Sequence, residues 1–160
     1  MTEKSLKLHI RPAELSDRDF ILTLVPRFVE FHLPAWRNPD RMTATNQRIL
    51  ATAFDTPPAN SAILIAEDRL GDRRGFIHLQ TNTDYFSGEA YGYIADIAVS
   101  PADERQGVGQ ALMEAGEAWA RQKGYRLLAL EVFAQNERAC RFYEKLGYRE
   151  EVRKYVKVLL

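Results

Sequence analysis

The sequence predicts an α+β or α/β fold, in which helices cover both faces of a mixed sheet. The apolar pattern changes from a helical period to a strand period after Pro57-Pro58, and a strand–helix–strand order follows over residues 91–133. That order implies a parallel strand pair joined by a right-handed crossover. The length of 160 residues is close to the commonest size of one domain, so we expect a single domain over residues 1–160.

The N-terminal third is predicted to hold one strand and two helices. Apolar and polar residues alternate in L-K-L-H-I at 6–10, as they do in a half-buried strand, and Pro12 ends the run. Asp17 stands where a cap would start the first helix. Pro34 and Pro39 interrupt the chain before the second helix. The predicted helices cover residues 18–30 and 44–54.

Three strands are predicted next. Residues 62–66 and 75–80 are short apolar runs on either side of a turn at Gly71-Asp72, which is the pattern of a hairpin. The run Y-G-Y-I-A-D-I-A-V at 91–99 is rich in β-branched and aromatic residues and predicts a further strand.

The C-terminal part is predicted to alternate between helices and strands. Gly124 and Gly147 are expected to end helices, because glycine readily adopts the left-handed conformation found at helix C-termini. The elements predicted for this part are a helix over 107–122, a strand over 126–133, a helix over 137–145, and two short strands with a tight turn within 148–160.

Composition excludes several classes of protein. The 22 basic and 22 acidic residues balance to a net charge of zero, so neither nucleic acid nor an anionic membrane is expected as a partner. No run approaches the roughly 20 apolar residues of a membrane span, and the N-terminus lacks the pattern of a signal peptide. The single cysteine, Cys140, excludes an internal disulfide. A cytoplasmic location is therefore expected.

Gly107 and Gly109 stand in R-Q-G-V-G-Q, where the helix over 107–122 is predicted to begin. A helix N-terminus has unpaired N–H groups and a partial positive charge, so it can bind phosphate. Glycine removes side-chain bulk from such a turn, and Arg105 adds a charge that favours a diphosphate. The alternative is that the glycines only ease a turn between strand and helix. Neither a P-loop nor a dinucleotide-binding fingerprint is completed here.

A second compact group lies downstream, and four motifs stand in order along the chain. They are I-R-P-A-E-L-S-D at 10–17, Y-I-A-D-I-A-V-S-P at 93–101, R-Q-G-V-G-Q-A-L at 105–112 and N-E-R-A-C-R-F-Y-E-K-L-G-Y at 136–148. Together these motifs resemble the GNAT superfamily of N-acetyltransferases, which use acetyl-coenzyme A (acetyl-CoA), and the order of predicted elements is similar from end to end. The resemblance implies a three-layer α/β fold whose mostly antiparallel sheet contains a splayed central parallel strand pair.

The resemblance also implies how acetyl-CoA is bound. The pantetheine arm would pair with the backbone at Ile97, Ala98 and Val99, where the strand bulges and splays from its parallel neighbour. Asn136 would hydrogen-bond the cofactor, and Tyr143 would lie near its sulfur. The pyrophosphate would rest on the backbone amides of Arg105, Gln106, Gly107, Val108, Gly109 and Gln110.

Glu104 departs from the family pattern, which usually has Arg or Gln at this position. An acidic side chain beside a pyrophosphate is unfavourable, so Glu104 is expected to face away from it. No metal is expected, because His9 and His78 lie on predicted strands without the spacing of metal ligands. Cys140 suits a small packed residue better than a nucleophile.

Tyr143 is the predicted general acid. Thioester aminolysis passes through a tetrahedral oxyanion, which a strand N–H left unpaired by a bulge can stabilise. Collapse of that intermediate expels a thiolate, which a nearby phenol can protonate. A tyrosine has an ordinary pKa of about 10, so it holds its proton at neutral pH. The alternative is that Tyr143 only packs its ring in the core.

The acceptor amine must also lose a proton before it attacks. Asp96 is the predicted base, with Tyr93, Glu131 or a water relay as alternatives. A bulge shifts the strand register at this point, so the sequence leaves open which side chain faces the acceptor. The alternative for Asp96 is a carboxylate satisfied by neighbouring loop amides.

The acceptor is expected to be a primary amine of a small molecule or a peptide. Phe31, His32 and Trp36 could line its pocket, although aromatic residues at this spacing are also typical of a core. One alternative function is a non-catalytic coenzyme-A-binding sensor or regulatory module. Another is transfer of a longer acyl group, which a pocket near Tyr93 and Phe133 would decide. The apolar end V-K-V-L-L could pair as an edge strand in a homodimer.

Overall fold

The computed structural model describes residues 7–104 and 106–160. Within these two ranges, none of the helices combines the length and the apolar character needed to cross a bilayer. The helix predicted over 137–145 is present with these bounds. The elements are, in chain order, β1 (His9–Pro12), the 3-10 helix η1 (Leu15–Asp17), α1 (Arg18–Leu24), the 3-10 helix η2 (Val25–Val29), α2 (Pro39–Asp55), β2 (Ala62–Glu67), β3 (Arg73–Thr83), β4 (Ala90–Val99), the 3-10 helix η3 (Pro101–Asp103), α3 (Val108–Gln122), β5 (Leu128–Leu130) and α4 (Glu137–Lys145).

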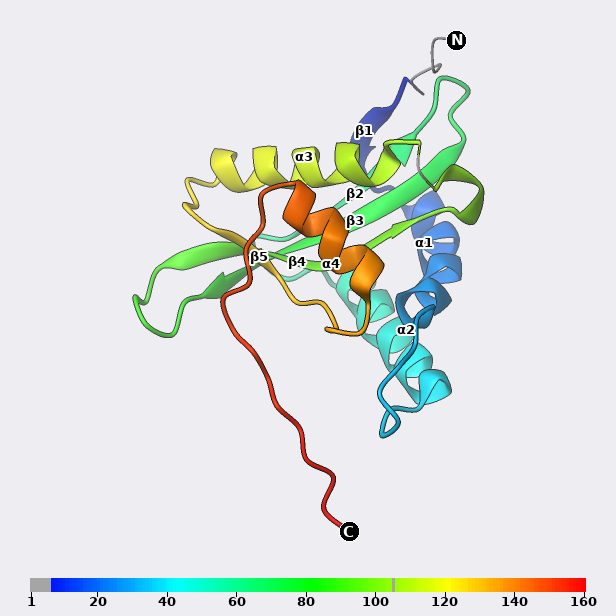
Figure 1. Ribbon diagram of the computed structural model, residues 1–160. Coiled ribbons are helices and arrows are strands. Elements are labelled where there is room, and N and C mark those ends of the chain that lie inside the picture. Colours follow the sequence, from blue (N-terminus) through cyan, green and yellow to red (C-terminus); the bar gives the residue numbers. More distant parts are fainter. Residues whose placement is uncertain (1–6, 105) are drawn as a thin grey trace.

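The described strands form one mixed sheet in the order β1-β2-β3-β4-β5. Neighbouring strands are antiparallel except for β4 and β5, which are parallel and are connected through α3. Figure 1 shows α3 and α4 on one face of the sheet and α1 and α2 on the other. The predicted class, a mostly antiparallel mixed sheet with a parallel pair and helices on both faces, is therefore confirmed.

A bulge in β4 determines how the candidate site is built. Two consecutive residues of β3, His78 and Leu79, lie opposite Asp96 and Ile94, so Ala95 is an extra residue without a partner on β3. The parallel ladder between β4 and β5 ends at the same Ile94. Beyond this point no described strand pairs with that edge of β4. The end of the ladder agrees with the splay expected for the parallel pair.

Two apolar cores fill the space on either side of the sheet. The core on the side of α1 and α2 contains Phe76 and Ala98, whereas Ile97 and Val99 pack on the side of α3 and α4. Side chains alternate along a strand. Asp96, two residues before Ala98, therefore shares the side of α1 and α2.

Prolines in the N-terminal third act differently from the prediction. The helix predicted over 18–30 stops at Leu24, because Pro26 has no N–H to continue the helical hydrogen bonds, and the chain proceeds as η2. Pro39 was expected to interrupt the chain, but it is the first residue of α2, where a missing N–H costs no hydrogen bond.

Asp17 occupies the predicted N-cap position of α1, but its side chain makes no capping hydrogen bond there and instead holds an ion cluster. Its fully buried carboxylate accepts hydrogen bonds from Arg11 at 2.7 and 3.0 Å and from the backbone N–H of Glu14 at 2.7 Å. Arg73 of β3 donates a further bond. Burial alone would raise the pKa of Asp17, but these hydrogen bonds bring it well below its usual range. The carboxylate ties β1 and η1 to β3.

The prediction of two strands within 148–160 is wrong. In the described chain no strand or helix follows Lys145, and Figure 1 shows the C-terminal segment running away from the rest of the molecule. Residues 149–160 contain no Gly, Pro, Asn or Asp, the residues that usually make a tight turn. The strand predicted over 126–133 is shortened to β5. β5 lies at the edge of the described sheet, because no described strand pairs with its outer side.

Candidate functional site

The chain enters α3 through Gly107. Its φ of 81° lies in the left-handed region that favours glycine, and a Cβ built on it would meet no atom within 4 Å. The positive φ therefore explains why position 107 is a glycine, whereas contacts with neighbouring atoms do not. The Gly107 carbonyl accepts a hydrogen bond from the N–H of Ala111 at 3.0 Å. The N–H groups in the first turn of a helix have no acceptor within that helix.

Gly109 is required for a different reason. A Cβ at this position would lie 3.3 Å from the ring of Phe142 on α4 and 3.8 Å from Val99. The absence of a side chain lets α4 approach the first turn of α3 and the end of β4. These three elements therefore converge at Gly109.

The other residues predicted to hold the pyrophosphate have varied surroundings. The N–H of Gln106 already donates to a carbonyl of η3 at 3.3 Å. The side chain of Val108 is buried in the core, and the side chain of Gln110 donates to Glu114 at 3.0 Å. Arg105 lies outside the described residues.

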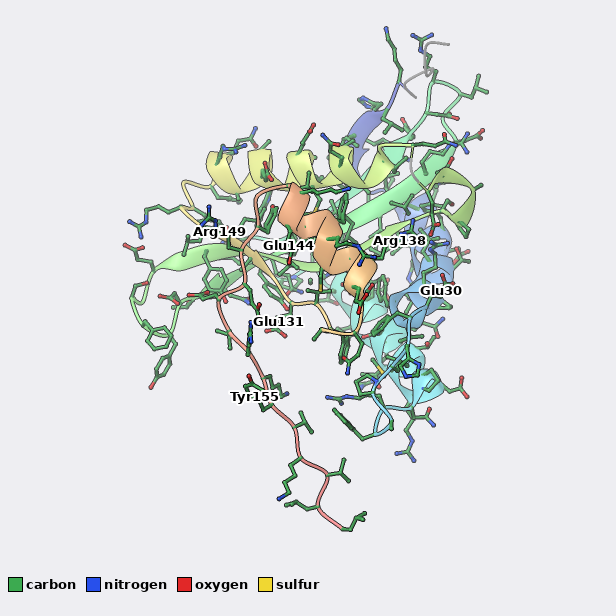
Figure 2. All side chains as sticks on the ribbon, viewed as in Figure 1. Glu30, Glu131, Arg138, Glu144, Arg149 and Tyr155 are labelled. Atoms are coloured by element: carbon green, nitrogen blue, oxygen red, sulfur yellow. The ribbon has the colours of Figure 1, made fainter. Side chains whose placement is uncertain are left out.

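Glu104 joins η2 to α4. One of its carboxylate oxygens accepts a hydrogen bond from Arg27, and the other accepts from Arg138 at 3.2 Å. Figure 2 labels Arg138 in the first turn of α4. The hydrogen bond from Arg138 is the main cause that lowers the pKa of Glu104, and Arg27 adds to it. The acidic residue that departs from the family pattern is therefore ionised and held by two guanidinium groups.

The residues predicted to bind pantetheine follow the bulge on β4. The backbone of Ile97, Ala98 and Val99 pairs with β3 on one edge, and β5 has ended on the other edge. Alternate residues of a strand direct their N–H and C=O groups toward the same edge. The N–H and C=O groups of Ile97 and Val99 therefore point toward the same edge of β4.

Asp96 is hydrogen-bonded to a histidine that sequence analysis leaves without a role. The Nδ1 atom of His78 lies 2.9 Å from Asp96 Oδ2, and Nε2 lies 3.5 Å from the side-chain amide of Gln80. An ionised carboxylate can only accept, so Nδ1 carries the proton and Nε2 accepts. His78 is 1% exposed and the Asp96 side chain is 18% exposed. The signal for this pair is the hairpin register, which sets the two residues directly opposite each other.

Tyr93 and Glu131 lie on the same side of the sheet as Asp96. Tyr93 is in register with Ala129 of β5, so Glu131, two residues further on, shares its side. Burial raises the pKa of Tyr93, and the nearby carboxylates of Glu131 and Asp96 raise it further. The three side chains considered as bases therefore face one side together, which the sequence left open.

Asn136 is the N-cap of helix α4, which carries Tyr143. The side-chain oxygen of Asn136 accepts from the N–H of Ala139 at 3.3 Å, which leaves its NH₂ group as a donor. The ring of Tyr143 packs against Phe142 and Tyr148, with centroids 5.4 and 6.2 Å away, in the core beneath α3 and α4. Burial raises the pKa of Tyr143 to about 12, so the phenol holds its proton more strongly than a free tyrosine.

Of the aromatic residues considered for the acceptor pocket, one contacts the segment that follows β5. The ring of Phe31 lies 5.6 Å from the ring of Phe133, over which the guanidinium of Arg37 stacks at 5.9 Å. Trp36 is 47% exposed, and His32 is also exposed. The segment after η2 therefore contacts the chain just beyond β5, on the side where Glu131 lies.

A family model and several curated proteins are similar to this chain. The model described as the acetyltransferase (GNAT) family matches residues 25–148. The uncharacterized N-acetyltransferase YhfO of Bacillus subtilis (strain 168) is 30% identical over 144 residues, which cover 90% of this chain and 91% of that protein. The aminoglycoside N(6')-acetyltransferase type 1 of Stenotrophomonas maltophilia is 30% identical over 98 residues, or 59% of this chain and 64% of that protein.

A solved structure supports the same fold. The aminoglycoside N-acetyltransferase AAC(6')-Iy in complex with CoA superposes with a TM-score of 0.69 at 20% identity, covering 99% of each chain. Some relatives are longer proteins. The mycothiol acetyltransferase of Amycolatopsis mediterranei is 29% identical over 63% of this chain, but the chain spans only 40% of its length.

Proposed function

The chain belongs to the acetyltransferase (GNAT) family and is an acyltransferase, and from this premise we propose that it transfers an acetyl group from acetyl-CoA directly to the primary amine of a small molecule. One observation supports the proposal most. The end of β4, the first turn of α3 and helix α4 converge at Gly109, beside an edge of β4 that no described strand occupies.

The residues around this edge fit the chemistry of acetyl-CoA. A Cβ at Gly107 would point into open space, so an anion can approach the backbone there. We assign the pyrophosphate to the N–H groups from Gly107 to Gln110, and the pantetheine arm to the backbone of Ile97 and Val99. The NH₂ group of Asn136 is the assigned side-chain donor. When bound, acetyl-CoA supplies the thioester carbonyl that the amine attacks.

Asp96 is assigned to remove the proton from the acceptor. His78 donates to one of its oxygens and so fixes the orientation of the carboxylate. The second oxygen remains to accept a proton from the ammonium group, directly or through a water relay that includes Tyr93 or Glu131. The neutral amine then forms the new C–N bond, and an N–H in the bulged segment of β4 stabilises the oxyanion. Asp96 passes the first proton to solvent, and the nitrogen loses its second proton by the same route as the intermediate collapses to the amide.

Tyr143 is assigned to protonate the leaving group. When the C–S bond breaks, the electron pair stays on sulfur, and the phenol gives its proton to the thiolate. A pKa of about 12 keeps Tyr143 protonated before this step. The phenolate that forms in the apolar core is costly, so it recovers a proton from solvent before the next cycle.

A small-molecule amine is the acceptor class that the relatives support. The similar protein from Stenotrophomonas maltophilia is named as an aminoglycoside acetyltransferase. In this chain, Glu131 and Asp96 place negative charge on the side of the sheet that carries Phe31 and Phe133. This combination of carboxylates and aromatic rings suits a cationic, amine-bearing compound.

The test combines binding with turnover. The protein is incubated with acetyl-CoA and a panel of aminoglycosides, polyamines and peptides while free thiol and acetylated product are followed, and calorimetry measures the affinity for acetyl-, propionyl- and succinyl-CoA. We expect thiol release that depends on a small-molecule amine and a preference for the acetyl donor. Binding without turnover across the whole panel would contradict the proposal and favour a coenzyme-A sensor.

A further inference from the structure

Arg37 holds its guanidinium group over the ring of Phe133, just beyond β5. The Cζ atom lies 5.9 Å from the centroid of that ring, within the range of a cation–π contact. Arg27 and Arg138 are both engaged by Glu104. Within the described ranges, by contrast, no carboxylate pairs with Arg37 and no group hydrogen-bonds to its guanidinium. Its N–H donors therefore remain available to a ligand.

The fold presets where this guanidinium lies. The backbone N–H of Arg37 donates to the carbonyl of Pro34 at 2.9 Å, which closes a turn, and Pro34 is buried. The next residue, Asn38, caps α2 by accepting from the N–H of Arg41 at 2.9 Å. Because a closed turn leads directly into a helix, the backbone at Arg37 has little freedom. Binding an anion there therefore costs less ordering entropy.

The ring beneath the guanidinium is also fixed, and it stays partly open. The Phe133 carbonyl accepts a hydrogen bond from the N–H of Asn136 at 2.9 Å, and Asn136 is the N-cap of α4. Phe31 packs against the ring, with centroids 5.6 Å apart. Phe133 is nevertheless 36% exposed. It can therefore support the apolar part of a ligand while Arg37 holds a charged end.

Negative charge lies close to this guanidinium along the chain. Glu131 is exposed and stands two residues before Phe133, a step of about 7 Å in an extended chain. Figure 2 labels Glu131 just after β5. Asp96 lies on the same side of the sheet and is partly exposed. One small molecule can therefore meet carboxylates at one end and a guanidinium at the other.

We propose that Arg37 binds a carboxylate of the acceptor, so that the acceptor is a small amino carboxylate whose ammonium group faces Asp96 and Glu131. The assignment of Arg37 rests on the proposed acetyl transfer, because the amine of the same compound is acetylated. A guanidinium presents paired N–H donors that match a carboxylate. A compound with only positive charges is disfavoured, since one of them would lie against Arg37. Arg37 is therefore a specificity-determining residue that selects zwitterionic amines.

The first test compares matched acceptors with acetyl-CoA as donor. Lysine is paired with cadaverine, which lacks the carboxylate, and ε-aminohexanoate is paired with ε-aminohexanamide, whose neutral amide has nearly the same size. We expect kcat/KM to be at least about 10-fold higher for the carboxylate of each pair, because a hydrogen-bonded charge pair is lost in its partner. Acetylation of both members at equal rates would overturn the role of Arg37 and leave the acetyl transfer standing.

The second test changes the guanidinium. Arg37→Gln should lower kcat/KM for ε-aminohexanoate about 30-fold and change the value for the amide less than about twofold. Arg37→Lys keeps the charge but loses the paired donors, so it should fall between the two. Arg48→Gln is the matched control, since Arg48 is exposed on α2, and it should change neither value. An equal loss for both acceptors in Arg37→Gln, with an unchanged circular dichroism spectrum, would overturn the proposal.

The third test measures binding without turnover. Calorimetry titrates ε-aminohexanoate or its amide into protein saturated with CoA, which has no acetyl group to transfer. We expect the carboxylate to bind at least about 10-fold more tightly, and the difference to disappear in Arg37→Gln. This result without any acetylation would support the carboxylate site and contradict the proposed transfer. Equal affinities for the two ligands would overturn the carboxylate site itself.

Discussion

The two sides of β4 differ in the environment that each gives to an ionisable group. On one side, Asp96 is partly exposed and is held by the buried imidazole of His78. On the other side, Tyr143 packs among aromatic rings that raise its pKa to about 12 by burial. A polar, hydrogen-bonded surrounding suits a group that must accept a proton, whereas an apolar surrounding keeps a phenol protonated.

The bulge at Ala95 lets one strand present both environments at one place. It resets the alternation so that Asp96 joins Tyr93 on the side of α1 and α2, while Ile97 and Val99 face α3 and α4. Asp96 and Tyr143 then lie on opposite sides of the sheet. Each of the following changes alters one side of this comparison.

The largest effect is expected for Tyr143→Phe. The ring and its packing are kept, but the thiolate loses its proton donor, so kcat should fall about 100-fold. Calorimetry should find the affinity for CoA within about threefold of the unaltered protein, since the amides of α3 are untouched. Turnover equal to that of the unaltered protein would remove Tyr143 from the acid role.

The pH dependence of the unaltered protein also tests the acid role assigned to Tyr143. A raised pKa means that the phenol keeps its proton until the pH approaches about 12. The rate constant kcat should therefore rise with pH as the amine is deprotonated, and it should show no decline between pH 8 and pH 10. A descending limb in this range that disappears in Tyr143→Phe would show that burial does not raise the pKa of Tyr143 as described.

On the polar side, Asp96→Asn should lower kcat/KM for the amine about 30-fold at neutral pH. The amide keeps the size of the side chain but cannot take a proton. The matched variant Glu131→Gln, on the same side of the sheet, should cost less than about fivefold. If Glu131→Gln is the more damaging of the two, the base is Glu131.

Gly107→Ala and Gly109→Ala separate the two reasons for glycine at the start of α3. Alanine at φ 81° is strained and should lower the free energy of unfolding by about 1 kcal/mol, with a drop in Tm of about 3 °C. Alanine at Gly109 meets Phe142 at 3.3 Å, so α4 must shift and kcat should fall several-fold through Tyr143. The same loss of kcat in Gly107→Ala would contradict this division.

The smallest effect is expected for Glu104→Gln. The lost ion pairs with Arg27 and Arg138 are partly exposed, so the cost should be below about 1 kcal/mol and should vanish in high salt. Because the folded state lowers the pKa of Glu104, its contribution is present above the ordinary pKa of a glutamate and is lost as the pH falls below it. Urea unfolding at pH 7 and in acid measures this difference.

Local sequence signals predicted the elements around the site better than the contacts within it. The bounds of α4 follow from Asn136 and Gly147, which lie at its ends. The pairing of His78 with Asp96 depends on the register of β3 and β4 beside the bulge, and the sequence pattern does not determine that register. The need for glycine at 109 depends on Phe142, more than thirty residues later. The bulge and the splay came from the resemblance to a family, and no local pattern would have given them.

The C-terminal part shows the opposite case. The composition of residues 148–160 fits two short strands with a tight turn, but residues 149–160 have no turn residue and form no strand. Composition predicts that a segment prefers to be extended, but it does not determine whether the segment joins a sheet.

The most direct test of the two-sided account varies the acceptor amine in both variants. An alkoxyamine is already unprotonated at neutral pH, so it needs an acid but no base. With a common alkylamine, both Asp96→Asn and Tyr143→Phe should be slow. With the alkoxyamine, we predict that Asp96→Asn recovers to within about threefold of the unaltered protein while Tyr143→Phe stays about 100-fold slower. Equal recovery of both variants, or of neither, would contradict the assignment of base and acid to opposite sides of β4.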